Sequence, residues 1–365
     1  MSSTRSTGLS VGLSMLTLVP GGMGGSETYA RALTRQLDGI DEVSAVAVLP
    51  ASAAGFSEGI PERVVEQVRG GASTGDRLRT VATATVRAKS IRRLTADRDV
   101  VHFPFTVSVP RPTRHQGFVQ SLLDVQHLDL PQLFSRAELA YRHHFYQGAA
   151  KRADVVITIS EFAKTRMVQL LGLSPEKIRV AHLGVDTSAF VPNFGERENF
   201  VLYPARGWAH KNHARLVEAM AVVRTSIPGI RLVLTGGNLD SLGALPDWVD
   251  RLGLVSTEKL HSLYRSASAI AFPSLYEGFG LPPLEAMASG CPAAVSNAGS
   301  IPEVCGDAAI LFDPLDVGAI ASGIETAIAD RATLSMAGVH QAARFTWEAC
   351  RDVHLSAYRQ ALQSV

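Results

Sequence analysis

The sequence predicts an α/β protein made of two doubly wound, Rossmann-like domains that face a central cleft. Short β-branched runs alternate with longer helical patterns, which is typical of βαβ units in a parallel sheet. The alternation breaks once, at residues 187–198, and then starts again. A chain of 365 residues also suits two compact domains better than one.

The expected strands fall into two series, one on each side of the break. Those of the first series are 11–18, 43–50, 100–104, 118–124, 155–160 and 178–184. Those of the second series are 199–205, 230–237, 268–274, 292–297 and 308–313. Residues 187–198 combine proline, glycine and charged residues and show neither the helical nor the strand periodicity, which favours a linker there. We therefore expect an N-terminal domain at 1–186, a C-terminal domain at 199–344, and an amphipathic helix at 345–365 that packs back on the first domain.

Charge and composition exclude several classes of protein. Lys plus Arg number 35 and Asp plus Glu 34, which argues against an electrostatically driven nucleic-acid binder. Residues 1–190 hold 22 basic and 17 acidic side chains, so the first half is expected to meet an anionic partner. No apolar stretch approaches the ~20 residues that span a bilayer, which excludes an integral membrane protein. The three cysteines form no paired framework, so a reducing cytoplasm is expected.

The densest motif is YEGFGLPPLEAMASGCP, at 276–292. Gly278 and Gly280 let the backbone approach a ligand closely, and the prolines that follow suit the first turn of a helix. The N–H groups at such a helix start can bind a phosphate. Glu285 is placed to accept hydrogen bonds from ribose hydroxyls, and Glu277 from a sugar. The alternative is an ordinary strand-to-helix turn with two solvated glutamates.

A second motif, ARGWAHKNH at 205–213, directly follows the first expected strand of the second domain. Arg206 supplies a fork of donors and Lys211 a point charge, a combination that suits a diphosphate. The alternative is a basic turn in which Asn212 caps the next helix.

Two patterns could be taken for metal ligands, and both are disfavoured. His210 and His213 have no cysteine or carboxylate partners nearby in the sequence. Asp97 and Asp99 form the D-x-D spacing that suits a metal-bound sugar nucleotide, but they precede a strand, at the sheet end away from the cleft. No metal is therefore expected.

A third motif, PGGMGGSETYARALTRQL at 20–37, is a glycine-rich turn between a strand and an amphipathic helix. It fails the dinucleotide fingerprint because Glu27 stands where the last glycine belongs, which excludes a nicotinamide oxidoreductase. Gly24 and Gly25 can still present backbone donors to the cleft. The alternative is a tight packing turn between helix and strand.

Residues 122–134, LLDVQHLDLPQLF, carry two candidates for proton transfer. Asp124 ends a strand and His127 lies in the loop after it, so either could act on a proton in the cleft. For His127, a surface or packing role is the alternative.

Residues 77–98 hold seven basic side chains and one acidic one along an expected helix. Such a helix can lie on an anionic membrane, although a solvated helix face is favoured because its apolar side is mostly alanine and threonine.

Together these stretches resemble the retaining glycosyltransferases of family 4, a group with many bacterial mannosyl- and other hexosyltransferases. The resemblance covers nearly the whole chain and is most specific at 276–292. It implies the GT-B architecture, with the donor bound mainly by the second domain. The other matching segments are the glycine loop at 21–25, LLDVQHL, TISEF (158–162), LGVD (183–186), WAHKNH (208–213), SIPEVCGDAAILFDP (300–314) and the final FTWE helix.

The resemblance also implies roles for individual residues. Arg206 and Lys211 would hold the diphosphate, Glu285 the ribose, and Glu277 the donor sugar. The expected donor-binding residues are Gly24, Gly25, Arg206, Lys211, Glu277, Gly278, Phe279, Gly280, Leu281 and Glu285, and the catalytic candidates are Arg206, Lys211, Glu277, His127 and Asp124.

One position departs from the family pattern. Many relatives have His-Asp where this chain has Leu123 and Asp124, and in several of them that histidine orients the reacting sugar. Either His127 takes over this role or the chain lacks it.

The function expected from the sequence is transfer of a hexose, mannose or a related sugar, from a nucleotide diphosphate sugar to an acceptor hydroxyl. Retention of anomeric configuration, no cofactor and no metal are expected. WAHKNH is similar to relatives that build surface polysaccharides from GDP-mannose or deoxysugar donors. The acceptor would be a sugar, a lipid-linked molecule or another small molecule. The protein is expected in the cytoplasm, where residues 77–98 could make weak contact with the inner face of the membrane. The alternatives are a sugar phosphorylase, a nucleotide-sugar epimerase and a non-catalytic nucleotide-sugar binding protein.

Overall fold

The computed structural model describes residues 8–71 and 73–365, which divide into two compact units. The first unit contains the described residues up to Ile159, together with Ala163–His182 and Trp347–Val365. The second contains Ser160–Phe162 and Leu183–Thr346. The segment 187–198 lies inside the second unit by this division, where the Asn193 N–H donates to the Ser289 carbonyl at 3.1 Å.

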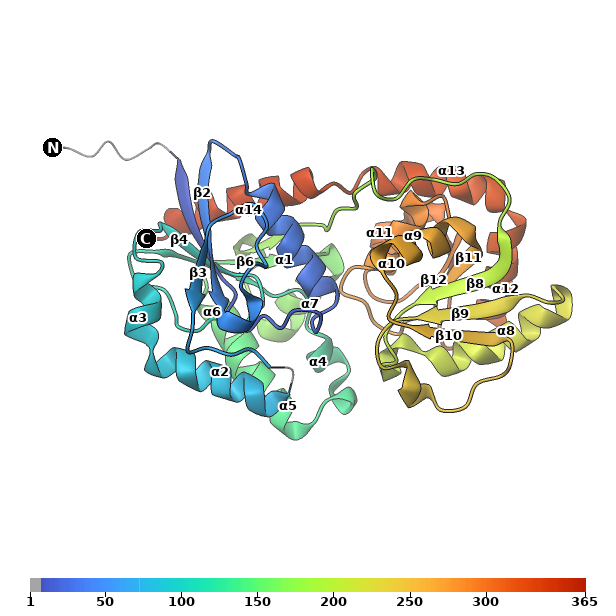
Figure 1. Ribbon diagram of the computed structural model, residues 1–365, viewed down its shortest axis with the longest axis horizontal. Coiled ribbons are helices and arrows are strands. Elements are labelled where there is room, and N and C mark those ends of the chain that lie inside the picture. The colour runs from blue at the N-terminus through green and yellow to red at the C-terminus, as the bar shows by residue number, and fades with distance from the viewer. Residues whose placement is uncertain (1–7, 72) are drawn as a thin grey trace. The chain divides into compact units, whose positions relative to one another are not determined.

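The described part of the first unit has a seven-stranded parallel sheet in the order β3-β2-β1-β4-β5-β6-β7 (Figure 1). The order reverses between β1 and β4, as in a doubly wound fold. The strands are β1 Leu9–Ser14, β2 Val43–Pro50, β3 Glu62–Val65, β4 Val100–Phe103, β5 Gly117–Ser121, β6 Val155–Thr158 and β7 Ile178–Val180.

Helices join these strands. They are α1 Gly25–Gln36, α2 Thr74–Val86, α3 Ala88–Arg93, α4 Gln126–Asp129, α5 Arg136–Arg142, α6 Gly148–Arg152, α7 Glu161–Leu171 and α14 Trp347–Leu362, with a π-helix, η3, at His143–Gln147. Short 3-10 turns lie at η1 Ala51–Ala53, η2 Pro131–Leu133 and η4 Pro175–Lys177.

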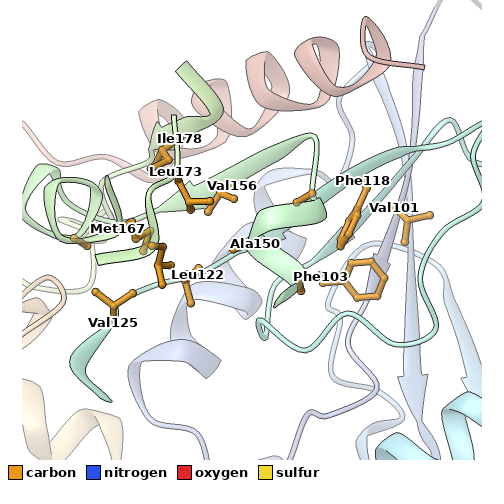
Figure 2. Packing of buried hydrophobic residues seen from close by; sticks show 14 residues of the cluster. Val101, Phe103, Phe118, Leu122, Val125, Ala150, Val156, Met167, Leu173 and Ile178 are labelled. Carbon is orange, nitrogen blue, oxygen red and sulfur yellow. The ribbon is translucent and has the colours of Figure 1, made fainter. Parts of the chain in front are cut away.

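Apolar side chains between β4, β5, β6 and the helices α6 and α7 form a core of this unit (Figure 2). Phe103 and Phe118 meet edge to face with their ring centroids 5.5 Å apart, while Met167 and Val156 are fully buried. Burial of such apolar surface is the main favourable contribution to folding.

The C-terminal helix α14 is fastened to the first unit by a fully buried polar network. Tyr29 of α1 contacts both His354 Nε2 and Ser121 Oγ at 2.7 Å. His102 contacts Ser121 Oγ at 2.7 Å and the Tyr358 hydroxyl at 2.9 Å. His354 Nδ1 lies 2.8 Å from the Cys350 carbonyl, which can only accept, so Nδ1 carries the proton and Nε2 accepts from Tyr29. The network thus joins α1, β4, β5 and α14.

The described part of the second unit has a six-stranded parallel sheet in the order β10-β9-β8-β11-β12-β13. Here the order reverses between β8 and β11. The strands are β8 Glu198–Pro204, β9 Arg231–Thr235, β10 Val249–Gly253, β11 Ala267–Phe272, β12 Ala293–Ser296 and β13 Ile310–Phe312.

Helices cover both faces of this second sheet, with α9 and α10 on one face and α8 on the other (Figure 1). The helix α13 packs on α10, and α12 packs on α8. The helices are α8 His213–Ser226, α9 Thr257–Ser266, α10 Leu281–Ala288, α11 Ile301–Cys305, α12 Val317–Ala329 and α13 Arg331–Ala342, with 3-10 turns η5 Ala209–Lys211, η6 Leu239–Leu242 and η7 Gly306–Ala308.

The predicted fold class is confirmed, and each expected strand appears with its ends shifted by a few residues. Two edge strands, β3 and β10, were not predicted because they are short and carry charged side chains. The helix expected over 77–98 is divided in two, since Arg87 leaves the helical conformation between α2 and α3. Among the described residues, no helix is long and apolar enough to cross a membrane.

The network around α14 predicts a pH-dependent stability. Burial lowers the pKa of His354 from 6.5 to about 4. The unfolded chain therefore takes up this proton first as the pH falls, so the stabilisation present above pH 6.5 is lost between pH 6.5 and 4. We expect wild type to lose ~2 kcal/mol through this group between pH 6.5 and 4.5, and His354→Gln to lack that part of the loss.

Urea unfolding at a series of pH values measures this difference. The exposed His115→Gln substitution, in the same unit, is the control and should leave the pH dependence of wild type unchanged. Parallel stability curves for wild type and His354→Gln would contradict the prediction.

Candidate functional site

Two loops of the second unit begin where its strand order reverses. β8 ends at Pro204 and its neighbour β11 ends at Phe272, and the two strands are parallel. Loop 205–212 and loop 273–280 therefore leave the same edge of the sheet, side by side. Doubly wound sheets bind ligands at this edge, outside the carboxyl ends of the strands at the reversal. Both sequence motifs of the second domain begin on these loops.

An ion pair joins the two loops. Lys211 Nζ lies 2.5 Å from Glu277 Oε1, and the two side chains are 14% and 13% exposed. The backbones also meet, because the Leu275 N–H donates to the His210 carbonyl at 2.8 Å. The lysine predicted for the diphosphate and the glutamate predicted for the sugar are thus brought into direct contact.

Hydrogen bonds from two neighbouring side chains fix the backbone around Lys211. The Tyr203 hydroxyl donates to the Lys211 carbonyl at 2.6 Å. Asn212 adopts a left-handed conformation with φ 61°, which asparagine tolerates better than most residues. Its amide donates to the carbonyls of Pro273, at 3.1 Å, and Pro314, at 2.7 Å. Asn212 does not cap α8 through its side chain, the alternative that the sequence allowed, because the capping atom, Oδ1, accepts instead from the Arg215 guanidinium at 3.0 Å.

Two serines hold the glutamate loop. Ser300 Oγ lies 3.0 Å from the Glu277 carbonyl and 2.8 Å from the Phe279 carbonyl, and Ser160 Oγ donates to the Gly278 carbonyl at 2.8 Å. In a planar trans peptide the N–H of the next residue points opposite to the carbonyl. The three following N–H groups, through Gly280, therefore point away from the serines, an arrangement that suits an anion.

The helix α10 begins directly after this loop. Gly280 precedes it with φ 108°, and a Cβ there would lie 2.6 Å from the Ile301 side chain, so the position requires glycine. The prolines at 282 and 283 carry no N–H, and the Leu284 N–H donates to the Gly280 carbonyl. The first-turn N–H that can meet a ligand is therefore that of Leu281.

Glu285 lies one turn into α10. Its Oε2 accepts a hydrogen bond of 2.8 Å from the Tyr264 hydroxyl, at the end of α9. Burial raises the pKa of this carboxyl to about 7, and the hydrogen bond from Tyr264 acts in the opposite direction. A carboxylate whose ionisation is opposed by its surroundings is characteristic of functional sites.

Arg206 follows β8 directly. Its guanidinium lies over the Trp208 ring, 5.4 Å from the centroid. The histidines of the same motif separate from one another: His213, at the start of α8, is buried with its ring 4.8 Å from that of Tyr203, while His210 lies 5.7 Å from Trp208. Among the described residues, no group of three or more His, Cys, Asp or Glu side chains is placed to hold a metal ion.

The remaining predicted residues lie in the first unit. Gly24 precedes α1 with φ 57°, and a Cβ on Gly25 would meet no described atom within 4 Å, so packing does not require glycine at Gly25. Asp124 Oδ1 accepts from the Gln126 N–H at 3.0 Å. His127 lies in the one-turn helix α4 and not in a loop, is 1% exposed, and its pKa is lowered to about 4 by burial. Its catalytic role stays a prediction.

The D-x-D carboxylates lie at the amino end of β4 and have structural partners. Asp97 pairs with Arg63 at 2.6 Å, and Asp99 Oδ2 lies 2.5 Å from Ser10 Oγ.

The sequence did not single out the residues that support the site. These are Tyr203, Ser160, Ser300 and Tyr264. Hydroxyl side chains in buried runs are common, so only the carbonyls and the carboxylate that they contact distinguish them.

Two family models match the chain in succession. The model described as Glycosyltransferase Family 4 matches residues 23–189, and the model described as Glycosyl transferases group 1 matches residues 185–344. A curated relative, the O-antigen chain mannosyltransferase B of Escherichia coli, is 29% identical over 273 residues, which are 68% of this chain and 71% of the relative. The chain spans about half the length of several further curated relatives that it matches.

Solved structures show the same fold. Sucrose-phosphate synthase from Thermosynechococcus elongatus superposes with a TM-score of 0.78 at 19% identity, covering 98% of this chain and 100% of that one. Anabaena HepE, in complex with UDP and glucose, superposes with a TM-score of 0.69 at 20% identity, covering 95% and 98%.

The surroundings of Glu285 predict a stability gain on its neutralisation. Its pKa in the folded protein, about 7, lies above the ordinary 4.5, so its contribution to stability is full below pH 4.5 and is lost as the pH rises through 7. Glu285→Gln keeps an acceptor for Tyr264 but carries no charge. We expect the variant to be more stable than wild type by ~2 kcal/mol at pH 8 and by much less at pH 5.

Urea unfolding at both pH values tests this expectation. The exposed Glu196→Gln substitution serves as the control and should change stability equally little at both pH values. A Glu285→Gln protein less stable than wild type at pH 8 would show that the ionised carboxylate is stabilised in place.

Proposed function

The chain belongs to the family 4 glycosyltransferases of the GT-B fold, and from this premise we propose that it transfers a hexose from a nucleotide diphosphate sugar to an acceptor hydroxyl with retention of anomeric configuration. Mannose or a related sugar is favoured, because the relatives include O-antigen chain mannosyltransferases. A nucleotide donor is supported by the Anabaena neighbour, which is described in complex with UDP and glucose. The observation that carries the proposal is the Lys211–Glu277 pair at the strand reversal of the second unit.

The diphosphate is proposed to bind at the joined loops. Arg206 supplies a planar fork for phosphate oxygens and Lys211 a mobile point charge. The loop N–H groups that point away from Ser160 and Ser300 add neutral donors, and the Leu281 N–H adds another at the start of α10. These donors are held in place before the ligand arrives, so they need little reorganisation on binding.

The remaining parts of the donor are assigned to the two glutamates. Glu277, with the backbone of Phe279, Gly280 and Leu281, holds the donor sugar, and Glu285 holds the ribose. Glu277 pairs with Lys211 in the structure. When the donor binds, Lys211 turns to the diphosphate and Glu277 to sugar hydroxyls, so the pair keeps each group in position for its later partner.

The difficult step is departure of a charged diphosphate from an oxocarbenium-like sugar. The bond between C1 and the phosphate oxygen breaks while the acceptor oxygen bonds to C1 from the same face, and the leaving phosphate oxygen takes the acceptor proton. This route uses no enzyme nucleophile. Arg206, Lys211 and the loop N–H groups stabilise the charge that develops on the leaving group, so we propose a reaction without metal or cofactor.

The acceptor belongs to the biosynthesis of a polysaccharide, a glycolipid or a glycosylated metabolite under this proposal. The protein is proposed to act in the cytoplasm. Weak contact with the inner membrane face through 77–98 is supported by the basic side chains of α2 and α3.

An assay of the product tests the proposed function. The protein is incubated with GDP-, UDP-, dTDP- and ADP-hexoses and a panel of sugar and lipid-linked acceptors, and the anomeric proton of the product is followed by NMR. Transfer with retention from one donor is the expected result. Consumption of inorganic phosphate, or interconversion of the donor sugars without transfer, would replace the proposal with a phosphorylase or an epimerase.

Removal of the lysine charge is predicted to abolish most of the activity. Lys211→Met should lower kcat/KM at least ~100-fold, the usual effect of removing a donor that stabilises developing charge. The variant also leaves Glu277 partly buried and unpaired, which destabilises the fold. The double variant Lys211→Met with Glu277→Gln removes that charge, and we expect it to fold normally and remain inactive.

Steady-state rates and melting temperatures are compared for both variants. Lys259→Met, an exposed lysine in the same unit, is the control and should retain wild-type turnover. Near-normal kcat/KM in folded Lys211→Met would contradict the role of this cation.

A further inference from the structure

Tyr264 is a fully buried side chain that the proposed mechanism does not use. It lies in the last turn of α9, and its hydroxyl donates to Glu285 Oε2 of α10 at 2.8 Å. Of the two helices joined by this bond, α10 carries residues proposed to bind the donor. The hydroxyl thus donates its hydrogen bond to one oxygen of a single carboxylate.

A hydrogen bond also fixes the backbone of Tyr264. Its carbonyl accepts a hydrogen bond of 3.1 Å from Arg197, whose guanidinium also contacts the carbonyls of Arg265, Ala267 and Asn193. Its ring lies against that of Phe190, edge to face, with 6.1 Å between centroids. A tyrosine fixed at both ends can impose a direction on the group that it contacts.

The contact leaves Glu285 with one oxygen for another partner. Within the described part of the chain, Oε1 accepts no hydrogen bond, while Oε2 is held by Tyr264. A carboxylate held through one oxygen has a fixed plane, so its other oxygen presents lone pairs in a defined direction. The donor from Tyr264 also favours the ionised form of a carboxyl whose pKa burial raises. The ionised form accepts hydrogen bonds more strongly than the neutral form and keeps both lone pairs of Oε1 for hydroxyl donors.

We infer that Tyr264 is a positioning residue that fixes the Glu285 carboxylate for recognition of the ribose diol, and that the preference for ribose over sugars lacking these hydroxyls depends on this bond. The inference rests on the proposed function and extends it. Tyr264 acts through Glu285 and does not touch the reacting atoms. Its loss should therefore weaken binding of the donor and leave the chemical step nearly intact.

The test compares two ligands on one variant. Tyr264→Phe and wild type are titrated with the nucleoside diphosphate that binds wild type most tightly and with its 2′,3′-dideoxy analogue. Wild type should prefer the ribose form at least ~10-fold, as expected for hydrogen bonds to a charged group. In Tyr264→Phe the preference should fall to about 3-fold or less, through weaker binding of the ribose form alone.

Kinetics and a second variant separate positioning from general damage to the fold. KM for the donor should rise ~10-fold in Tyr264→Phe while kcat changes less than ~3-fold. On a Glu285→Gln background, Tyr264→Phe should cause no further loss of ribose preference, because the group it positions is gone. Tyr141→Phe removes a similarly buried hydroxyl from the first unit and should leave the preference unchanged.

The outcomes distinguish the two claims. If wild type binds no nucleoside diphosphate, the proposed function fails and the inference fails with it. If wild type prefers ribose and folded Tyr264→Phe shows the same preference, the inference alone is overturned. Equal loss of affinity for both ligands in Tyr264→Phe would also overturn it, since that result indicates a general structural role.

Discussion

The ion pair between Lys211 and Glu277 is the interaction on which the site of the second unit depends. It connects two loops that leave neighbouring strands, and each partner is more than four-fifths buried. Burial of two charges is favourable only when their geometry is good and their surroundings supply further hydrogen bonds. The Leu275–His210 backbone bond and the Asn212 amide, which donates to the Pro273 carbonyl, hold the two loops in the geometry of the pair. The reversal of strand order brings both loops to one edge of the sheet, and the ion pair places two charged groups at that edge.

A layer of supporting residues keeps the pair and its loops in position. Tyr203 holds the Lys211 carbonyl, while Ser300 and Ser160 hold the carbonyls of the glutamate loop. At the amino end of β8, Arg197 donates to carbonyls at the ends of α9 and α10, including that of Gly290, and to the carbonyl of Asn193 in the segment before β8. Burial lowers the pKa of Arg197, but guanidinium groups remain charged in proteins, so these carbonyls keep a cationic donor. Rigid support of this kind lets a small number of polar groups bind a flexible donor specifically.

The fold and the two loops can be predicted from the sequence because both leave local signals. Alternating periodicity located the central strands, and the glycines, prolines and charges of the motifs marked the turns after β8 and β11. The edge strands β3 and β10 were not found, because charged edge residues hide the apolar pattern. The ion pair was not predicted either, since it joins residues 66 positions apart that only the strand order brings together. Likewise, the aromatic rings beside His127 come from Phe134, at the end of its own motif, and from Tyr146, which lies outside the motif, so the motif alone does not show how His127 is buried.

The role of the joined loops in diphosphate binding can be measured directly. Calorimetric titration of wild type with a nucleoside, its monophosphate and its diphosphate, each at 50 and 300 mM salt, separates base and ribose binding from diphosphate binding. We expect the diphosphate to bind at least ~10-fold more tightly than the monophosphate, with an advantage that shrinks at high salt, because Arg206 and Lys211 contact its charged oxygens. Equal affinities for the monophosphate and the diphosphate at both salt concentrations would contradict it.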